Sequence, residues 1–587
     1  MSAPGRWHLR LTPTDGSPVQ GARTKPHAFG LVGGVVAVAI AVWMAAHRAW
    51  ICDDAFISFR YAENFVRGLG LVFNRGERVE GYTNFLWTVW ISLGLKLGAD
   101  AEGWSAAWGI VAYGVAIGLL AHHARRRTRL SGAALVLPLA ALLGALHLDW
   151  QRYATSGLET SLFTMLLVLA YVLLLARTSP ITSSATVGVV LALAAMTRPE
   201  GALFAVLGGV FVLWTRPRRW RALAAFALGY LALWGPFTLW RITYYGDVFP
   251  NTFYAKSGGE AWWGQGWTYV RLYFQKYWVM AAALPAAGVS LWLARSKGPR
   301  QAPSGASRLA TETLLATAFS LGLLAYVMRV GGDFMFARML VPVTPFLLVL
   351  LELALVPLLS RRPAMGLLAS GVVLATVWWS PEPIKDAGEV SGIVNEQVHY
   401  PKPVTDDLRW RALSLRPFLA GLPVCVAFLG SEARLVYYAR PPVAIECETG
   451  LTDRWVAHQP LARRGRVGHE KHAPPDYLIG RRRAHVTFHS HAPDLLGLRE
   501  YIPQVTADFG GFGAFILHWD GPLMAELRRR GVKFADFPSE LDETIAELPR
   551  LTDTEVRDAY AKIRHFYFDF VPDSARERPF LSRLRGS

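Results

Sequence analysis

The feature that most constrains this chain is a series of apolar runs, each close to the ~20 residues that a helix needs to cross a bilayer. Eleven such runs occur before residue 381. A soluble protein would have to bury all of them in one core, and only 18% of the residues are charged. The sequence therefore predicts an α-helical polytopic membrane protein with about eleven transmembrane helices, over residues 29–49, 103–122, 131–147, 158–176, 182–197, 200–215, 222–240, 276–294, 310–328, 339–359 and 364–380.

Basic residues between these runs predict the orientation of the chain. They gather in the N-terminal tail, residues 1–28, and again after every second run. Because short cytoplasmic loops are enriched in Lys and Arg, we place the tail and these clusters in the cytoplasm and the opposite loops outside. The net charge of +17 then indicates topology rather than binding of nucleic acid. The expected location is the plasma (inner) membrane, and no signal-peptide cleavage pattern follows the polar start.

Two further stretches are predicted to lie along the outer membrane surface instead of crossing it. Phe85–Leu97 falls short of the ~17 residues of the thinnest crossing, and it carries tryptophans, which favour the membrane–water boundary. Counting it as a span would place the Arg125–Arg127 cluster outside. Trp262–Tyr277 is rich in Trp and Tyr and is expected to lie in the same way.

The composition changes after Pro381. Residues 381–587 are more charged, and stretches such as Val424–Leu429 and Ala514–His518 alternate as strands do. The sequence predicts a cytoplasmic tail (1–28), a transmembrane domain (29–380) whose first exterior loop covers 50–102, and a periplasmic or extracellular α+β domain (381–587). This last part is long enough for its own core. Cys425 and Cys447 both fall in it, where an oxidising compartment would allow a disulfide.

The first exterior loop begins with two adjacent acids, Asp53 and Asp54. They come directly after a span, at the boundary between water and hydrocarbon. Partial desolvation and mutual repulsion there raise the pKa of at least one of them, which suits a general base. The alternative is a pair of solvated acids at a helix start, because Asp is a common N-cap.

Charged residues also gather in the other exterior loops. Taken singly, each arginine is better explained as an interfacial anchor. Charges near hydrocarbon are costly, however, so their convergence on one face indicates function. Together they predict a pocket with carboxylates for acid–base work and guanidinium groups to grip a phosphate. The candidates are Glu159, Arg198, Glu200, Arg241, Asp333 and Arg338.

Such a pocket at the mouth of an apolar bundle fits one type of reaction. A sugar on a polyprenyl phosphate would have its lipid tail in the bilayer, its phosphate on arginine and its anomeric carbon outside. A carboxylate would deprotonate an acceptor hydroxyl, which displaces the lipid phosphate in line. The expected partners are therefore the bilayer, a polyprenyl-phosphate sugar donor and a glycan acceptor of the cell envelope.

Three parts of the sequence resemble a known family. They read DDAFISFRYAENFVRGLGLVFNRGERVEGYTNFLW (Asp53–Trp87), GGDFMFARMLVPVTPF (Gly331–Phe346), and ETGLTDRWVAHQ (Glu448–Gln459) with RGRVGHEKHAPPDYL (Arg464–Leu478). They resemble the membrane arabinofuranosyltransferases that add terminal β-(1→2) arabinofuranose to mycobacterial arabinan, within the GT-C glycosyltransferase superfamily. The similarity extends from about residue 30 to residue 480.

The resemblance implies a GT-C-type multispanning bundle with an exterior C-terminal domain, a decaprenyl-phosphate-type donor and an inverting displacement. It places the superfamily's first-loop aspartates at Asp53 and Asp54, with Asp53 preferred as the base. The family's Gly-Gly-Asp loop falls on Asp333. Orientation of the first loop, or recognition of the donor sugar, is implied for Glu80, Gly81, Tyr82 and Asn84. Arg60, in the same loop, is a further candidate for binding the donor phosphate or sugar.

Several alternatives remain open at this point. Another GT-C transferase, of the mannosyl or aminoarabinose type with a protein or lipid acceptor, is one, and the sugar is open between arabinofuranose and another pentose or hexose. A transporter would have charges buried mid-span, whereas these spans are nearly free of ionisable residues. A divalent cation that bridges the donor phosphate and a carboxylate is one cofactor option. His469 and His472 are favoured as surface histidines rather than metal ligands.

Overall fold

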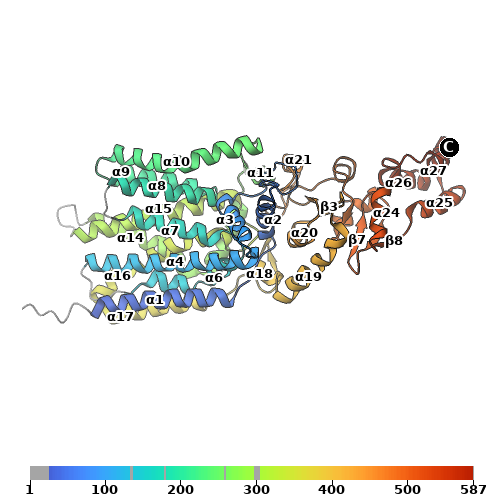
Figure 1. Ribbon diagram of the computed structural model, residues 1–587. Coiled ribbons are helices and arrows are strands. Elements are labelled where there is room, and N and C mark those ends of the chain that lie inside the picture. Colours follow the sequence, from blue (N-terminus) through green and yellow to red (C-terminus); the bar gives the residue numbers. More distant parts are fainter. Residues whose placement is uncertain (1–24, 132–136, 177–179, 257–258, 297–303, 586–587) are drawn as a thin grey trace, which may run out of the picture.

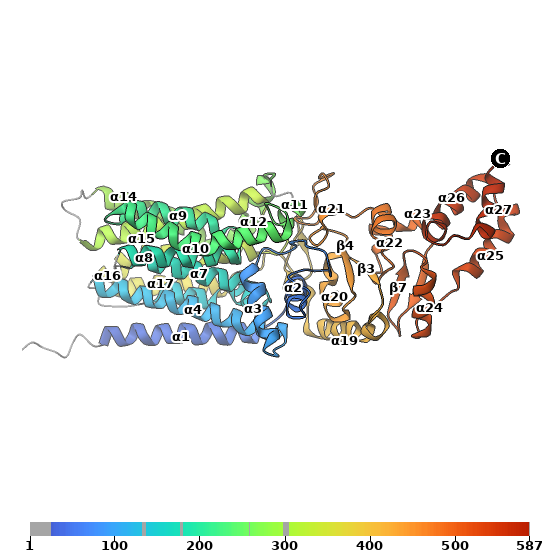
Figure 2. The same ribbon diagram turned by 45° about the horizontal axis from the view of Figure 1, so that its top comes forward.

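The computed structural model describes residues 25–131, 137–176, 180–256, 259–296 and 304–585. A bundle of long helices forms one end of the molecule and a domain with a β-sheet forms the other (Figure 1). Short helices and loops lie between them, and the turned view in Figure 2 shows the same three layers. The two acids predicted at the start of the first loop directly precede the helix of residues 55–66 in this middle layer.

Each of the eleven predicted spans contains a helix within the part of the chain that the structure describes. The helices are α1 (Lys25–His47), α4 (Ala101–Ser131), α5 (Leu139–Leu146), α7 (Thr160–Leu174), α8 (Pro180–Thr197), α9 (Gly201–Thr215), α10 (Arg219–Tyr245), α14 (Ala283–Ser296), α15 (Ser304–Val330), α16 (Thr344–Arg361) and α17 (Pro363–Trp378). Local chemistry explains where some of these helices begin and end. Pro363 opens α17, where its missing N–H costs no hydrogen bond, and α10 ends at Gly246 with a positive φ of 79°.

Fewer than eleven of these helices are long enough to cross a membrane completely. Among the described residues, five helices are long and apolar enough to cross a membrane, or six if α6 (Leu148–Thr155) and α7 count as one span bent by 117°. The other apolar helices are shorter, and α5 has only eight residues. The bundle is therefore that of a multi-pass membrane protein, and eleven crossings stays a prediction.

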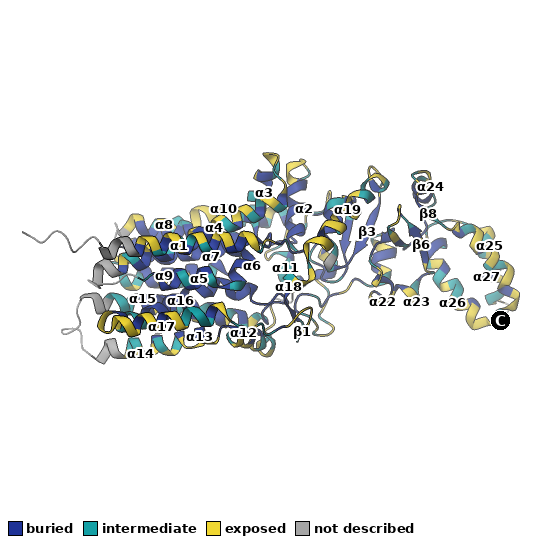
Figure 3. Cartoon of the chain, turned by 90° about the horizontal axis from the view of Figure 1, so that it is seen from below, coloured by how far each residue is buried: buried dark blue, intermediate teal, exposed yellow. Residues whose placement is uncertain are grey.

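The outward faces of the bundle are apolar, as a protein in lipid requires. In Figure 3 the exposed residues lie along the outer sides of the bundle helices and the buried residues between the helices. On α10, for example, Leu228 and Leu239 are 71% and 67% exposed. An exposed apolar surface of this kind is unusual in water but is expected against lipid.

The two stretches predicted to lie along the surface are helices, α3 (Phe85–Lys96) and α12 (Trp263–Lys276). Helix α12 buries Tyr269 and Tyr273 completely, while Trp263 and Trp267 on the same helix are more than half exposed. An aromatic helix with one buried and one exposed face matches an interfacial position.

The C-terminal region folds as the predicted α+β domain. Its six-stranded sheet has the order β4 (Val443–Glu446), β3 (Cys425–Phe428), β5 (Val486–Thr487), β7 (Gly513–Ile516), β6 (Val505–Asp508) and β8 (Lys533–Phe534). Strand β3 runs parallel to β4 and β5, and the other pairs are antiparallel. All four residues of β3 are buried, as in a central strand covered on both faces. Cys425 and Cys447 are buried free thiols and form no disulfide.

The first loop joins the bundle to this domain. Its helix α2 (Ala55–Val66) buries ten of its twelve residues. The ring of Phe56 on α2 lies 5.4 Å from that of Tyr437 on α20 (Ala433–Ala439), a helix of the C-terminal domain. The domain is thus packed directly on the loop that carries the predicted acids.

One group of charges lies inside the bundle, at the end away from the C-terminal domain. Arg127 of α4 pairs with Glu312 of α15 at 2.8 Å and also with Glu352 of α16, and His123 contacts Glu312 at 2.8 Å. The sequence analysis expected hardly any ionisable residues within the spans. These four are tolerated because each charge has a partner at hydrogen-bond distance.

Candidate functional site

The two adjacent acids of the first loop have different surroundings. Asp53 is only 1% exposed. Its Oδ2 accepts a hydrogen bond from the backbone N–H of Ala433 at 2.7 Å, and its Oδ1 accepts one from Arg434 at 2.9 Å. Burial raises the pKa of Asp53 to about 7, although these two hydrogen bonds favour the charged form. Asp53 therefore attaches the start of α20 to the first loop and has no free face for a substrate.

Asp54 is the accessible member of the pair. Its side chain keeps 26% of its surface exposed, and its Oδ2 lies 4.0 Å from a guanidinium nitrogen of Arg338. Asp54 stands at the N-cap of α2 but makes no capping hydrogen bond with its side chain. Its carboxylate is thus open to a ligand and lies beside a cation, which is the arrangement that the sequence analysis expected for Asp53.

Arg338 is held in place by the Gly-Gly-Asp loop. Its Nε donates to Asp333, which is 2% exposed. Gly331 and Gly332 precede Asp333 with φ values of 87° and 74°, and a Cβ on Gly332 would lie 2.5 Å from the ring of Tyr269. Only glycine fits at this position, because both the backbone angle and the space exclude a side chain. The predicted pair Asp333 and Arg338 is therefore brought to Asp54 by a tightly packed turn.

Arg198 forms a second ionic group at the bundle mouth. It pairs with Glu159 at 2.8 Å and also with Glu200. Asn84 donates to the other oxygen of Glu159 at 2.9 Å, and its own Oδ1 accepts from Ser58 at 3.1 Å. The structure brings these predicted residues together, but it surrounds the arginine with two carboxylates. Arg198 is thus occupied as a partner for acids more than it is available to a phosphate.

Four other predicted residues bind neighbouring segments and not Asp54. Arg60 donates to the backbone carbonyls of Phe73 at 2.9 Å and Pro441 at 2.8 Å, and burial lowers its pKa to about 9. The remaining contacts lie at the end of α10: Glu80 pairs with Arg241 at 2.7 Å, and the hydroxyls of Tyr82 and Tyr245 lie 2.9 Å apart. Burial raises the pKa of Glu80 to about 7 against the attraction of Arg241. These contacts fix the fold of the first loop.

Lys256 is a site residue that the sequence analysis did not select. It follows α11 (Asn251–Ala255) and is accessible to solvent. Desolvation by the surrounding protein lowers its pKa. The charges of Asp333 and Asp54 oppose this lowering, and those of Arg338 and Arg198 add to it. Lys256 therefore belongs to the same group of charges. A single lysine after a short helix gives no sequence signal of this position.

Residues of the C-terminal domain also lie near this group of charges. Arg466 lies over the ring of Phe334, at 4.6 Å, and His469 packs edge-on against that ring at 4.8 Å. Phe334 follows Asp333 directly, so the RGRVGHEKH string is part of the site surroundings. Glu396 of α18 (Glu396–His399) is buried, which raises its pKa to about 8, and the charge of Asp54 adds to this increase.

Two groups of histidines lie in the C-terminal domain. His469 and His472 lie in an irregular segment and share no helix face. Among the described residues, His485, His518 and Asp520 place ligand atoms within 4.8 Å of one another, in the C-terminal domain. The Nδ1 atom of His485 accepts a hydrogen bond from the backbone N–H of Cys425 at 3.0 Å, so its Nε2 carries the proton and faces Asp520. Coordination by that nitrogen does not fit this arrangement.

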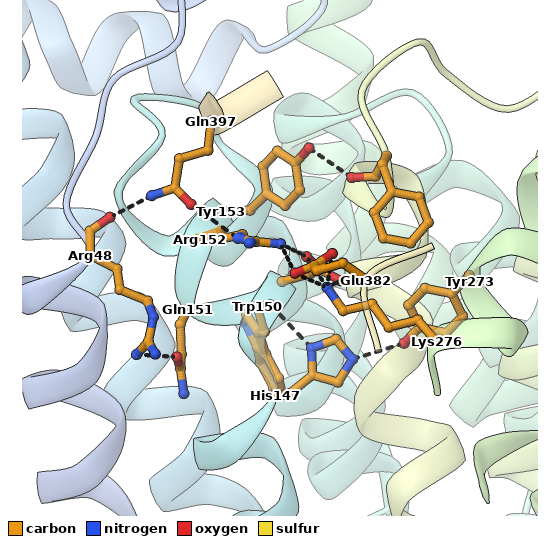
Figure 4. A network of polar contacts seen from close by, with 12 residues as sticks. Arg48, His147, Trp150, Gln151, Arg152, Tyr153, Tyr273, Lys276, Glu382 and Gln397 are labelled. Atoms are coloured by element: carbon orange, nitrogen blue, oxygen red, sulfur yellow. Dashed lines mark hydrogen bonds and ion pairs between the residues drawn. The ribbon is translucent and has the colours of Figure 1, made fainter. Parts of the chain in front are cut away.

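A network of ion pairs joins three further segments of the chain (Figure 4). Lys276 is fully buried and pairs with Asp149 at 3.0 Å and Glu382 at 2.9 Å. Arg152 contacts the same two carboxylates at 2.9 and 2.8 Å. His147 accepts from the backbone N–H of Trp150 at 3.1 Å. Two cations balance two anions, so this network has a structural role and holds α6, α12 and the segment after α17 together.

The chain is similar to two curated proteins, each described as a terminal β-(1→2)-arabinofuranosyltransferase. The protein from Corynebacterium glutamicum is 35% identical over 376 residues, which cover 58% of this chain and 53% of that protein. The protein from Mycobacterium tuberculosis is 27% identical over 536 residues, covering 76% of this chain and 84% of that protein. The chain therefore spans about half the length of the Corynebacterium relative, and the resemblance found in the sequence is confirmed.

The fold is shared with a solved structure. ArnT from Cupriavidus metallidurans in the apo state matches with a TM-score of 0.51 and 16% identity, over 85% of this chain and 99% of that one. The chain thus has the GT-C fold, as the resemblance implied. No protein-family model matches the sequence.

Proposed function

We propose that this GT-C-fold membrane protein is a glycosyltransferase that transfers arabinofuranose from a polyprenyl-phosphate donor to a glycan acceptor of the cell envelope. The observation that carries the proposal is the pair formed by Asp54 and Arg338 at the mouth of the bundle. It combines an accessible carboxylate with a cation 4.0 Å away. The named activity of the two relatives supports the choice of sugar and of reaction.

In this proposal Asp54 is the general base. Its carboxylate takes the proton from an acceptor hydroxyl, and the resulting oxygen attacks the anomeric carbon of the donor sugar. The bond between that carbon and the phosphate oxygen breaks, and the lipid phosphate leaves with the electron pair. Attack opposite the leaving group inverts the anomeric configuration. A phosphate needs little protonation to leave, so one base and nearby positive charge are sufficient.

Arg338 and Lys256 are the cations proposed to hold the leaving phosphate. Arg338 is fixed by Asp333, which leaves one edge of its guanidinium toward Asp54. Lys256 is accessible and its charge interacts with both Asp54 and Asp333. A planar guanidinium and a flexible ammonium bind phosphate oxygens in complementary ways, through a fixed fork and a movable point charge.

We also propose how the chain is oriented in the membrane and which residues form each domain. The tail (1–28) lies in the cytoplasm, the bundle (29–380) in the plasma membrane, and the domain of residues 381–587 on the exterior side together with Asp54. The arginines at the other end of the bundle support this orientation through the positive-inside bias. The domain then stands where a cell-envelope glycan approaches.

The test uses the purified full chain in liposomes. It receives decaprenyl-phosphoryl arabinofuranose with radiolabelled sugar and an arabinan oligosaccharide, and labelled product is measured by chromatography. Transfer that is lost in Asp54→Asn supports the proposal. Transfer only from another polyprenyl-phosphate sugar would assign a different GT-C reaction, and an unchanged rate in Asp54→Asn would remove Asp54 from the role of base.

A further inference from the structure

A cavity lies at the end of the bundle farthest from the C-terminal domain. It has a volume of about 490 Å³ and opens between α4, α7, α9 and α15. Figures 1 and 2 place the ends of these helices opposite the layer that holds α2, whose N-cap is Asp54. The cavity is therefore separate from the proposed transfer site.

The walls of this cavity carry an excess of positive charge. Four arginines line it, Arg126, Arg127, Arg216 and Arg308, and among the described lining residues the one carboxylate is Glu312. Arg127 is already neutralised by Glu312 and by Glu352 behind it. Among the described residues, Arg126 and Arg216 pair with no carboxylate, so their positive charges remain. The charge of Glu312 is already balanced by Arg127 and His123. An anion that enters the cavity is therefore attracted.

Arg216 is oriented by the chain and keeps an unused donor. Its two terminal nitrogens donate to the carbonyls of Leu174 at 2.8 Å and Ala176 at 3.1 Å, at the end of α7. Its Nε is buried and has no hydrogen-bond partner in the described part of the chain. A buried donor without a partner is costly, and an acceptor oxygen from a ligand would satisfy it.

Another part of the cavity wall is apolar, beside the threonines Thr215 and Thr311. It includes Val172, Leu175 and Phe211. Trp214, at the C-terminal end of α9, also lines the cavity and is 62% exposed. Tryptophan at such a position marks the level of the lipid headgroups. The cavity thus offers arginines for a phosphate and an apolar wall for the first part of an acyl chain.

We propose that this cavity binds the phosphate-bearing headgroup of an anionic membrane phospholipid. Basic pockets between transmembrane helices are suited to such headgroups, because arginine binds phosphate through charge-assisted hydrogen bonds while the acyl chains stay in the bilayer. The same donors would accept a free phosphate ester, so the test separates the two sources.

The full chain, purified in detergent, is examined by native mass spectrometry with phosphatidylglycerol, phosphatidylcholine or glycerol 3-phosphate added. Retention of phosphatidylglycerol about tenfold above phosphatidylcholine is expected, corresponding to ~1.4 kcal/mol. Arg126→Ala should abolish this preference. Arg125→Ala is the matched control, because Arg125 is the neighbouring residue and does not line the cavity.

Arg126 is exposed, so its substitution is expected to leave the melting temperature without lipid unchanged, and this measurement accompanies each variant. Equal retention of the two lipids, or an unchanged preference in Arg126→Ala, would overturn the proposal. Glycerol 3-phosphate bound as tightly as phosphatidylglycerol would also overturn it and assign the cavity to a soluble phosphate ester.

Discussion

The backbone N–H of Arg434 donates a hydrogen bond of 2.9 Å to the carboxylate of Asp53, although the two residues are 381 positions apart in the sequence. Ala433 donates to the other oxygen at 2.7 Å. One carboxylate of an adjacent pair is thereby used to attach a domain, and its neighbour Asp54 is left for a ligand. This separation of roles leads to the first prediction.

Asp54→Asn is expected to reduce transfer by at least a hundredfold, because a general base contributes ~10²–10⁴ in rate. Its melting temperature should match that of the original chain, since the Asp54 side chain makes no capping hydrogen bond. Asp53→Asn should instead lower the stability by ~1–3 kcal/mol, because an amide leaves one of the two N–H groups with a poorer partner. Kinetics and thermal unfolding of both variants check this, and the reverse pattern would return the base role to Asp53.

Lys256→Gln is expected to weaken donor binding about tenfold, which corresponds to ~1.4 kcal/mol. The reason is the loss of an accessible ammonium among Asp54, Asp333 and Arg338. The KM for the polyprenyl-phosphate donor is the measurement. Lys402→Gln, at an exposed lysine of the C-terminal domain, serves as the matched control. A KM for Lys256→Gln equal to that of the control would exclude Lys256 from donor binding.

Arg198→Gln tests whether this arginine serves structure or substrate. Its removal leaves Glu159 and Glu200 buried without their cation, so a loss of ~3–5 kcal/mol in the free energy of unfolding is expected. Arg198→Gln combined with Glu159→Gln should recover part of that loss, since one buried charge is removed with its partner. Thermal unfolding in detergent measures both. If the single variant is as stable as the original chain but binds donor weakly, Arg198 contacts the phosphate.

The stability of the protein is expected to fall as the pH rises from about 4.5 to about 8, in part because of Glu396. Its pKa in the folded chain is raised to about 8 from an ordinary value of 4.5. Between these values the folded state keeps a proton that the unfolded state has lost, so increasing pH favours unfolding. Melting temperatures over this range should show a shallower slope for Glu396→Gln. Glu389→Gln, at an exposed glutamate seven residues earlier, should keep the original slope.

Much of the fold could be predicted because hydropathy is a local property. Each apolar run contains a helix, and the strand-like stretches around Val424 and Ala514 contain β3 and β7. The bend of 117° between α6 and α7 could not be predicted from the sequence, because it depends on packing between distant segments. The buried ion pairs of Arg127 could not be predicted either, because its partners Glu312 and Glu352 come from two later helices.

The sequence indicated which residues to consider for the candidate site, but not which contacts each of them makes. The sequence analysis expected Asp53, Asp54, Asp333 and Arg338 in one pocket. The structure brings Asp54, Asp333 and Arg338 together, whereas the carboxylate of Asp53 contacts the start of α20. Sequence alone could not distinguish the two adjacent aspartates, because the groups that engage Asp53 begin α20, far along the chain. Arg60 and Arg241 looked like phosphate ligands for a similar reason. Their carbonyl and carboxylate partners are visible only in three dimensions.

The attachment of α20 to Asp53 has a consequence for protein engineering. A hybrid that takes residues 381–587 from a related enzyme would also replace the backbone donors that Asp53 requires, one peptide bond from the proposed base. The first loop and the C-terminal domain should therefore be exchanged together. A graft of the domain alone is expected to impair turnover even when every residue around Asp54 is retained.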